Sequence, residues 1–155
     1  MSVDNLAAAR EVVSPGRAGH RRIGFIGADN DFVLIARRQG YLDGLRVLNI
    51  PPREDDQTFA GRDYSFSSGV EAARRLLARP ERPTALFCIS DVLALGAVQA
   101  ARELGLRVPE DLSVVGFDDV ERRDGPPQAT TVRQPCYELG RTAGSFCSPR
   151  FRAAP

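Results

Sequence analysis

Short, almost wholly apolar runs alternate along this chain with longer segments in which apolar residues recur at helical spacing. The apolar runs cover Arg22–Gly27, Thr84–Ile89 and most of Ser113–Asp119, the segment SVVGFDD. Each run has the length of a strand and is followed by turn-forming or helix-capping residues. We therefore predict buried strands at these three places, and one more extended segment over TTVRQP, residues 130–135.

The segments between the apolar runs have the period of amphipathic helices. We predict helices over Asn5 to about Val13, over Phe32–Leu48, within SFSSGVEAARRLL (65–77) and over 91–104. In the third helix, Ser68 and Glu71 have the spacing of a capping box. Gly105 has the position of the residue that follows a helix C-cap, and Pro109 prevents the helix from continuing.

Continuous apolar strands that alternate with amphipathic helices are typical of a parallel sheet covered on both faces, because parallel strands are buried on both sides. The predicted fold class is therefore α/β, in three layers with the parallel sheet in the middle. The polar segment PREDDQTFAGRD (52–63) is interpreted as a connection.

Length and composition restrict the possibilities without identifying a function. The 155 residues suit one domain, and 21 basic against 20 acidic side chains give a net charge of +1, which does not indicate a nucleic-acid or membrane surface. No apolar run reaches the roughly 18 to 20 residues of a membrane span, and no signal-peptide pattern is present, so we expect a cytoplasmic protein. The odd number of cysteines (Cys88, Cys136, Cys147) has no CxxC spacing, which predicts reduced thiols, with Cys88 buried.

Enzymatic, metal and cofactor motifs are not found. His20 is the only histidine, which argues against a metal site, and the chain has no GxSxG, GxxxxGK[ST] or GxGxxG pattern. Asp118 and Asp119 are adjacent on a predicted strand, where neighbouring side chains point to opposite sides. They are therefore not an obvious acid and base pair, and we expect neither an enzyme nor a bound cofactor.

Polar side chains collect where the predicted strands end. Open α/β sheets bind ligands beyond the carboxyl ends of their strands, and Arg37, Ser90, Asp91, Asp118 and Asp119 all lie near such ends. For Asp91 and Asp119, starting a helix or a turn explains the position at least as well as ligand contact does. For Ser90, a helix cap and a ligand contact both stay open. For Arg37, a solvated helix charge and a ligand contact both stay open. Asp118, the last residue of its strand, is the strongest candidate.

The order of the motifs resembles the ligand-binding domain of the LacI/GalR family of bacterial transcription regulators, which is built like a periplasmic sugar-binding protein. The matching segments are GHRRIGFIG (19–27), ARRQGYLDGL (36–45), YSFSSGVEAARRLL (64–77), the long block from PTALF to GFDD (83–119) and TTVRQP (130–135). The resemblance extends roughly over residues 3–143. It implies a periplasmic-binding-protein-like fold and a sensor of a small effector, a sugar or a nucleoside, in a transcriptional repressor.

The resemblance also implies which side chains hold the effector. The family's arginine contact corresponds to Arg37, and its carboxylate acceptor corresponds to Asp118. Its packing aromatic corresponds to Tyr64, and its Asn or Ser donor corresponds to Ser90. Asp91 and Gln134 follow as further candidates. An arginine and a carboxylate suit a polyol, because each can form two hydrogen bonds with neighbouring hydroxyls.

The resemblance finally implies how the chain is organised. We expect an effector-binding lobe over 3–130, a crossover segment toward a second lobe over 131–147 and a frayed tail over 148–155. DNA binding belongs in the family to a helix-turn-helix that this chain does not contain. A homodimer is expected through the helix over 91–104, where Leu95 is either a partner contact or an ordinary core residue. The alternative is a free-standing dimerising or interaction module left from a truncated repressor.

Overall fold

The computed structural model describes residues 7–10, 19–28, 32–62, 64–118 and 130–133. One five-stranded sheet runs through the described part in the order β2-β1-β3-β4-β5, and every pair of neighbours is parallel. The strands are β1 (Ile23–Gly27), β2 (Gln57–Phe59), β3 (Ala85–Cys88), β4 (Ser113–Asp118) and β5 (Thr130–Arg133).

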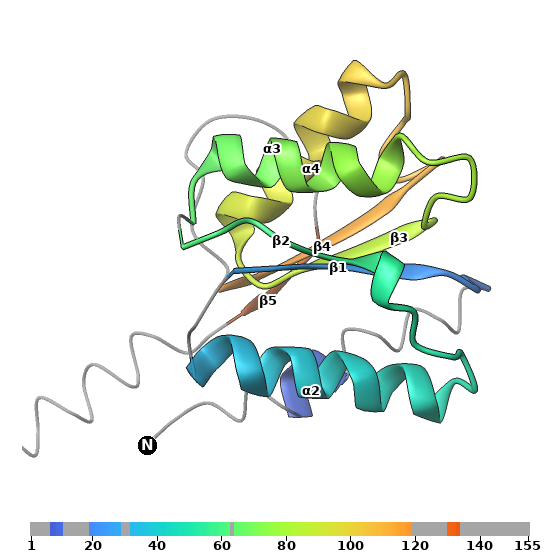
Figure 1. Cartoon of the computed structure of the whole chain (residues 1–155), viewed down its shortest axis with the longest axis vertical. Helices are drawn as coiled ribbons and strands as arrows, with labels where there is room; N and C mark the ends of the chain where they lie inside the picture. The colour runs from blue at the N-terminus through green and yellow to red at the C-terminus, as the bar shows by residue number, and fades with distance from the viewer. Residues whose placement is uncertain (1–6, 11–18, 29–31, 63, 119–129, 134–155) are drawn as a thin grey trace, which may run out of the picture.

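Helices cover both faces of this sheet (Figure 1). Helix α2 (Phe32–Val47) and the helical residues 7–10 lie on one face, and α3 (Phe66–Leu77) and α4 (Asp91–Glu103) lie on the other. A short 3-10 helix, η2 (Glu54–Asp56), precedes β2. The predicted α/β class and its three layers are confirmed. No helix among the described residues has both the length and the apolar character needed to cross a membrane.

The core lies between the central strands and their covering helices. All residues of β1 and β3 are buried, as the continuous apolar runs predict for parallel strands covered on both faces. Aromatic rings link the two strands to α2, because the Phe25 ring lies 5.1 Å from the Tyr41 ring and 5.8 Å from the Phe87 ring, centroid to centroid. The Tyr41 hydroxyl donates to the Ile23 carbonyl at 2.8 Å, which satisfies the polar atom that this packing buries.

The predicted end of α4 is confirmed. Gly105 has a φ of +75°, its N–H donates to the Arg102 carbonyl at 2.9 Å, and the next N–H, of Leu106, donates to the Ala101 carbonyl at 2.9 Å. These two bonds are those of a Schellman motif, which needs a residue that tolerates positive φ just after the C-cap.

Two sequence-based expectations need correction. Helix α3 is capped by Ser65 and not by Ser68, because the Ser65 side chain accepts the Ser68 N–H at 3.1 Å. Ser68 therefore lies in the first turn and supplies the donor that has to be capped. The supposed polar connection over 52–63 contains η2 and β2, and β2 pairs in parallel with β1 from Phe25↔Gln57 to Gly27↔Phe59.

The predicted segment over 130–135 contributes β5, an edge strand in the same sheet. The division into 3–130, 131–147 and 148–155 stays a prediction. Of the helix predicted over Asn5 to Val13, the structure describes residues 7–10, which are helical.

Candidate functional site

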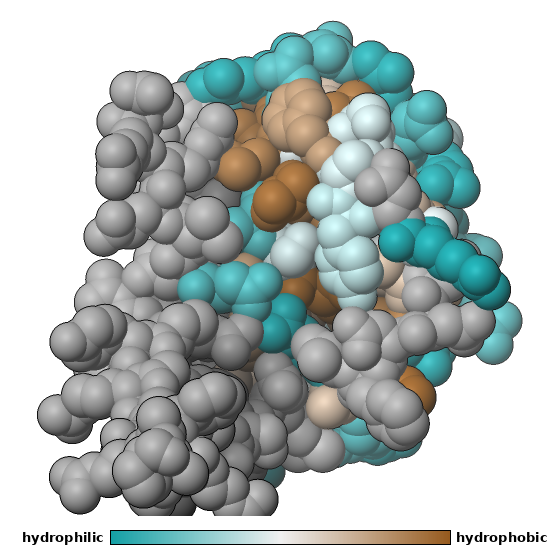
Figure 2. Space-filling view, turned by 90° about the vertical axis from the view of Figure 1, so that its left-hand side faces the viewer, coloured by the Kyte–Doolittle hydropathy of each residue, from teal (hydrophilic) through white to brown (hydrophobic). Residues whose placement is uncertain are grey.

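All five strands are parallel, so their carboxyl ends lie at one edge of the sheet, on the left of Figure 1. Figure 2 looks onto this edge and shows apolar side chains gathered in its upper part, at the level of α3 and α4, with polar side chains around them. The predicted contact residues that the structure describes come from the segments that meet here: α2, the start of α3, the start of α4 and the end of β4.

Arg37 crosses this edge from the α2 layer. One terminal nitrogen of its guanidinium donates to the Ile89 carbonyl, just after β3, and the other lies 3.0 Å from an oxygen of Asp118 at the end of β4. The guanidinium carbon is 3.7 Å from the centroid of the Phe117 ring. The side chain is 6% exposed, and a buried charge needs such partners to offset lost hydration. The solvated-helix-charge interpretation of Arg37 is therefore wrong.

Asp118 lies at the end of β4 as predicted, and its backbone is unusual. Its φ of +110° is in the region that favours glycine, so a residue with a Cβ is strained there. The side chain is 32% exposed, and one carboxylate oxygen forms the ion pair with Arg37. The preceding Phe117 is fully buried. The carboxylate is thus held at the edge while the ring beneath the guanidinium belongs to the core.

Ser90 and Asp91 lie at the start of α4. The Ser90 hydroxyl accepts the Leu93 N–H at 3.4 Å, which confirms the capping interpretation of Ser90, and contact with an effector stays a prediction. Asp91 is the first residue of the helix, and one of its carboxylate oxygens accepts the Thr131 hydroxyl at 2.6 Å. Asp91 therefore bonds to the edge strand β5.

Of the three remaining predicted residues, the structure describes Tyr64. Tyr64 is 37% exposed and directly precedes the cap of α3. Gln134 and Asp119 lie outside the described residues. Hydrogen bonds thus link Arg37 to Asp118 and to Ile89, the residue before Ser90. That Tyr64 belongs to the same site stays a prediction.

Sequence reasoning missed three groups at this edge: the Phe117 ring, the Ile89 carbonyl and the Thr131 hydroxyl. A carbonyl leaves no signal in a sequence, and Phe117 looks like any other core residue. Thr131 was detectable in principle, since pairing the 130–135 segment beside SVVGFDD brings its hydroxyl next to the start of α4.

Cys88 and His20, two further side chains with reactive groups, are held within the fold. Cys88 is fully buried, as predicted, and burial raises the pKa of its thiol. The His20 ring forms hydrogen bonds with Thr84 at 2.9 Å and Ser113 at 3.2 Å. Within the described ranges no cluster of three or more His, Cys, Asp or Glu side chains could hold a metal ion.

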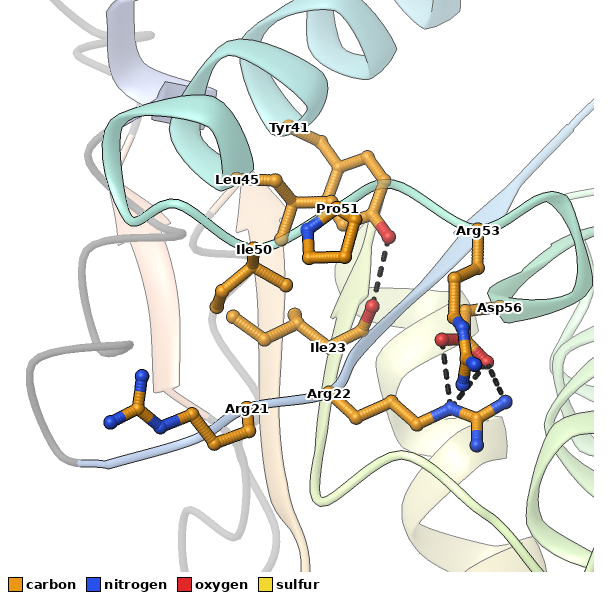
Figure 3. A pocket seen from close by; sticks show the side chains of 9 residues that line it. All are labelled: Arg21, Arg22, Ile23, Tyr41, Leu45, Ile50, Pro51, Arg53 and Asp56. Atoms are coloured by element: carbon orange, nitrogen blue, oxygen red, sulfur yellow. Dashed lines mark hydrogen bonds and ion pairs between the residues drawn. The ribbon is translucent and has the colours of Figure 1, made fainter.

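A hollow is present at the opposite end of the sheet, where β1 begins (Figure 3). Its lining combines apolar and charged side chains: Arg21, Arg22, Ile23, Tyr41, Leu45, Ile50, Pro51, Arg53 and Asp56. Arg22 binds both oxygens of Asp56, at 2.9 and 2.8 Å, and also Glu81 at 2.9 Å. The hydrogen bond to Asp56 raises the pKa of Arg22. The charge of Arg22 is thus matched by protein carboxylates, and the hollow lies at the other end of the sheet from Asp118, the last residue of β4.

Open α/β sheets bind ligands beyond the carboxyl ends of their strands, and Arg37 and Asp118 form their ion pair at that edge of this sheet. A family model described as a periplasmic binding protein-like domain matches residues 17–154. The chain belongs to that family, as an effector-binding domain of the LacI-family regulators.

The relatives are transcriptional repressors. The chain is 44% identical over 144 residues to the HTH-type transcriptional repressor CytR of Escherichia coli K12, covering 91% of this chain and 42% of that protein. It is 45% identical over 135 residues to the HTH-type transcriptional repressor PurR of Yersinia pestis strain Pestoides F, covering 86% and 39%. The chain thus spans less than half the length of these relatives. Their activity as repressors agrees with the expectation that the chain is not an enzyme.

Solved structures show the same fold. A complex named as transcriptional regulator CelR with cellobiose superposes with a TM-score of 0.85 at 34% identity, covering 96% of this chain and 46% of that chain. A LacI-family regulatory protein from Chloroflexus aggregans superposes with a TM-score of 0.83 at 33% identity, covering 90% and 50%.

Proposed function

We propose that this chain is the effector-sensing lobe of a LacI-type transcriptional regulator and that its effector is a small polyol, a sugar or a nucleoside. The observation that carries the proposal is the Arg37–Asp118 pair, fixed beyond the carboxyl ends of β3 and β4. Rigid, oriented donors and acceptors recognise neighbouring hydroxyls with little loss of conformational entropy on binding. The solved relative named with cellobiose supports a carbohydrate-like ligand.

In this proposal Asp118 accepts effector hydroxyls and Arg37 donates to them, while Tyr64 packs against the apolar face of the effector. Ser90 and Gln134 contribute further polar contacts, whereas Asp91 binds the Thr131 hydroxyl on β5. DNA binding belongs to a part of the regulator outside this chain, and an effector acts by binding DNA-competent and DNA-incompetent states with different affinity.

The test is a titration of the 155-residue chain with a panel of monosaccharides, disaccharides and nucleosides, followed by NMR chemical shifts, which also detect millimolar affinity. We expect one chemical class to shift the signals of the Arg37 and Asp118 segments. D118N and R37K should weaken that binding about 10-fold to 100-fold, since D118N removes the charge of the acceptor and R37K removes the planar pair of donors.

The matched controls are D43N and R46K, which alter an exposed pair of the same chemistry on α2, with Asp43 and Arg46 2.6 Å apart. Both should bind like the wild type. A folded chain whose signals respond to no member of the panel contradicts the proposal, as does binding that D118N leaves intact.

A second candidate function, a dimerising module, is favoured by one surface. Phe66 and Val92, at the starts of α3 and α4, are 47% and 38% exposed, and Leu95 is half-buried on α4. Figure 2 shows an apolar area on this face, and exposed apolar areas are of the kind that marks protein contacts. A homodimer through this area is part of our proposal for the regulator.

Light scattering coupled to size exclusion tests the dimer. We expect a dimer for the wild type, a monomer for F66E, and a dimer for the control V47E, because Val47 is 61% exposed on the opposite layer of the molecule. A wild-type monomer at every concentration contradicts both the homodimer and the dimerising module.

A further inference from the structure

Asp91 has a partner that effector binding does not require. Its carboxylate oxygen Oδ1 accepts the hydroxyl of Thr131 at 2.6 Å, and the two residues are 40 positions apart in the chain. Asp91 begins α4, whereas Thr131 belongs to β5. A hydrogen bond to a charged acceptor is among the stronger ones in proteins. The bond joins the helix layer to the edge of the sheet.

The strand between these two partners leaves room for the bond. The ladder pairs Thr131 with Gly116 on β4, and a Cβ at Gly116 would overlap Asp91 Oδ1 and lie 3.1 Å from the Ala94 Cβ. The Asp91 carboxylate therefore lies directly over the backbone of Gly116. A glycine at this strand position is explained by the close approach of that carboxylate.

The start of α4 also favours a carboxylate. Backbone N–H groups give a helix N-terminus partial positive charge, and an acidic side chain in the first turn is stabilised by it. The Ser90 side chain already accepts the Leu93 N–H. Ser90 thus caps the helix, and the Asp91 carboxylate is directed to β5.

Strand β5 is the element that needs an additional anchor. It lies at the edge of the sheet and pairs with β4 alone among the described strands. Its last described residue, Arg133, pairs with Asp118, the proposed effector acceptor. The position of β5 thus determines which backbone lies next to Asp118.

We propose that Asp91 is a positioning residue that fastens the edge strand β5 across Gly116 to the start of α4, and that it does not contact the effector. Its influence on the effector, which rests on the function proposed above, comes from holding β5 beside Asp118. Thr131 is its partner in this role.

The first test is a double-mutant cycle with T131V and D91A, measured by thermal unfolding of the 155-residue chain. Each single change should lower the melting temperature by about 3 to 8 °C. The melting temperature of the double variant should be no lower than that of the less stable single variant, because the two single changes remove the same bond. The control D91N keeps an oxygen acceptor and should lose less than D91A. Additive effects overturn the proposal.

Hydrogen exchange supplies a readout that a general loss of stability does not reproduce. In T131V and D91A the amides of β5 should exchange at least about tenfold faster, while those of β3 keep their protection. G116A should have the same effect on β5, because its methyl group displaces the Asp91 carboxylate. In a D91A background, G116A should add less than it does in the wild type, because the carboxylate is gone and only the contacts with the Ala94 Cβ at 3.1 Å and the residue-91 Cα at 3.2 Å are left. Equal acceleration in β3 and β5 overturns the proposal.

The effector found by the titration separates this inference from the proposed function. T131V and D91A should both weaken binding several-fold, and D91N should weaken it less. Coupled stability with unchanged affinity in D91A overturns the positioning role and leaves the effector site intact. If no compound binds, the proposed function fails, while the cycle and the exchange still decide whether Asp91 fastens β5.

Discussion

The Arg37 guanidinium is nearly excluded from water and still has a carbonyl, a carboxylate and an aromatic face as neighbours. Its partners come from the ends of two strands, and Arg37 itself comes from the helix on one face of the sheet. A planar group with donors in fixed directions is suited to such a position, and a lysine is not. At the scale of single residues, the candidate site is defined by Arg37 and by the Asp118 carboxylate that it binds.

Asp118 is held in a backbone conformation that disfavours any side chain. We predict that D118G is more stable than D118A by about 1 kcal/mol, because both remove the carboxylate and only alanine keeps the strained Cβ. Chemical denaturation of the two variants measures the difference.

The control is V115G against V115A on the same strand. There the glycine variant should be the less stable one, because glycine loses more backbone entropy on folding and relieves no strain. If D118A is the more stable variant at position 118, Asp118 does not carry this strain.

The strand-end rule was enough to predict Asp118, because the carboxyl end of an apolar strand can be located from the sequence. The burial of Arg37 was not predictable from its own segment. Its partners lie 52 and 81 residues away, and local periodicity carries no information on contacts at that distance.

Helices α3 and α4 cross at glycines. A Cβ at Gly69 would lie 2.8 Å from the Leu93 carbonyl oxygen, and one at Gly96 would lie 2.5 Å from the Phe66 carbonyl oxygen and 2.7 Å from the Val70 nitrogen. Backbone atoms cannot turn aside as side chains do. The two helices therefore pack backbone against backbone near their starts, which brings Phe66 and Val92 to one surface.

Replacing Gly96 should separate the two helices. Glycine to alanine inside an exposed helix usually stabilises by roughly 0.5 to 1 kcal/mol. We predict that G96A instead destabilises the chain by about 1 to 3 kcal/mol, because the methyl group meets backbone atoms of α3. The control E71A, on the exposed side of α3, should change stability by less than about 0.5 kcal/mol. A more stable G96A contradicts the close crossing.

The long periodic elements were predicted from the sequence, and the short ones were not. Helix α4 and strand β4 follow clear patterns with recognisable ends. Strand β2 has three residues, too few for a period to be visible, and it forms because β1 offers an edge to pair with. The start of α3 was misplaced by one turn because a serine stands at 65, 67 and 68, and only the hydrogen bonds distinguish them.

At the scale of the whole molecule, the sheet has two different ends. At the amino end, paired charges such as Arg22 with Asp56 surround a hollow. At the carboxyl end, Arg37 is bound to the Ile89 carbonyl and to Asp118. The fold class followed from the sequence because the alternation of strands and helices is a property of the entire chain. The registers depend on packing between distant segments and required the structure.

The strand order has a consequence for how the chain folds. Pairing β1 with β3 joins residues as distant as Ile23 and Ala85, whereas β3, β4 and β5 follow one another in both sequence and space. Closing a longer loop costs more entropy, and transition states favour contacts that are close in sequence. The half from β3 to β5 should therefore form first, and β1 with α2 should dock onto it later.

Φ-values measure this order of folding. We expect a φ-value of about 0.5 or more for V114A and below about 0.3 for I26V, and the reverse would contradict the order. In this order of events Arg37 meets Asp118 only after β3 to β5 have formed, so their ion pair completes the carboxyl edge of the sheet late in folding.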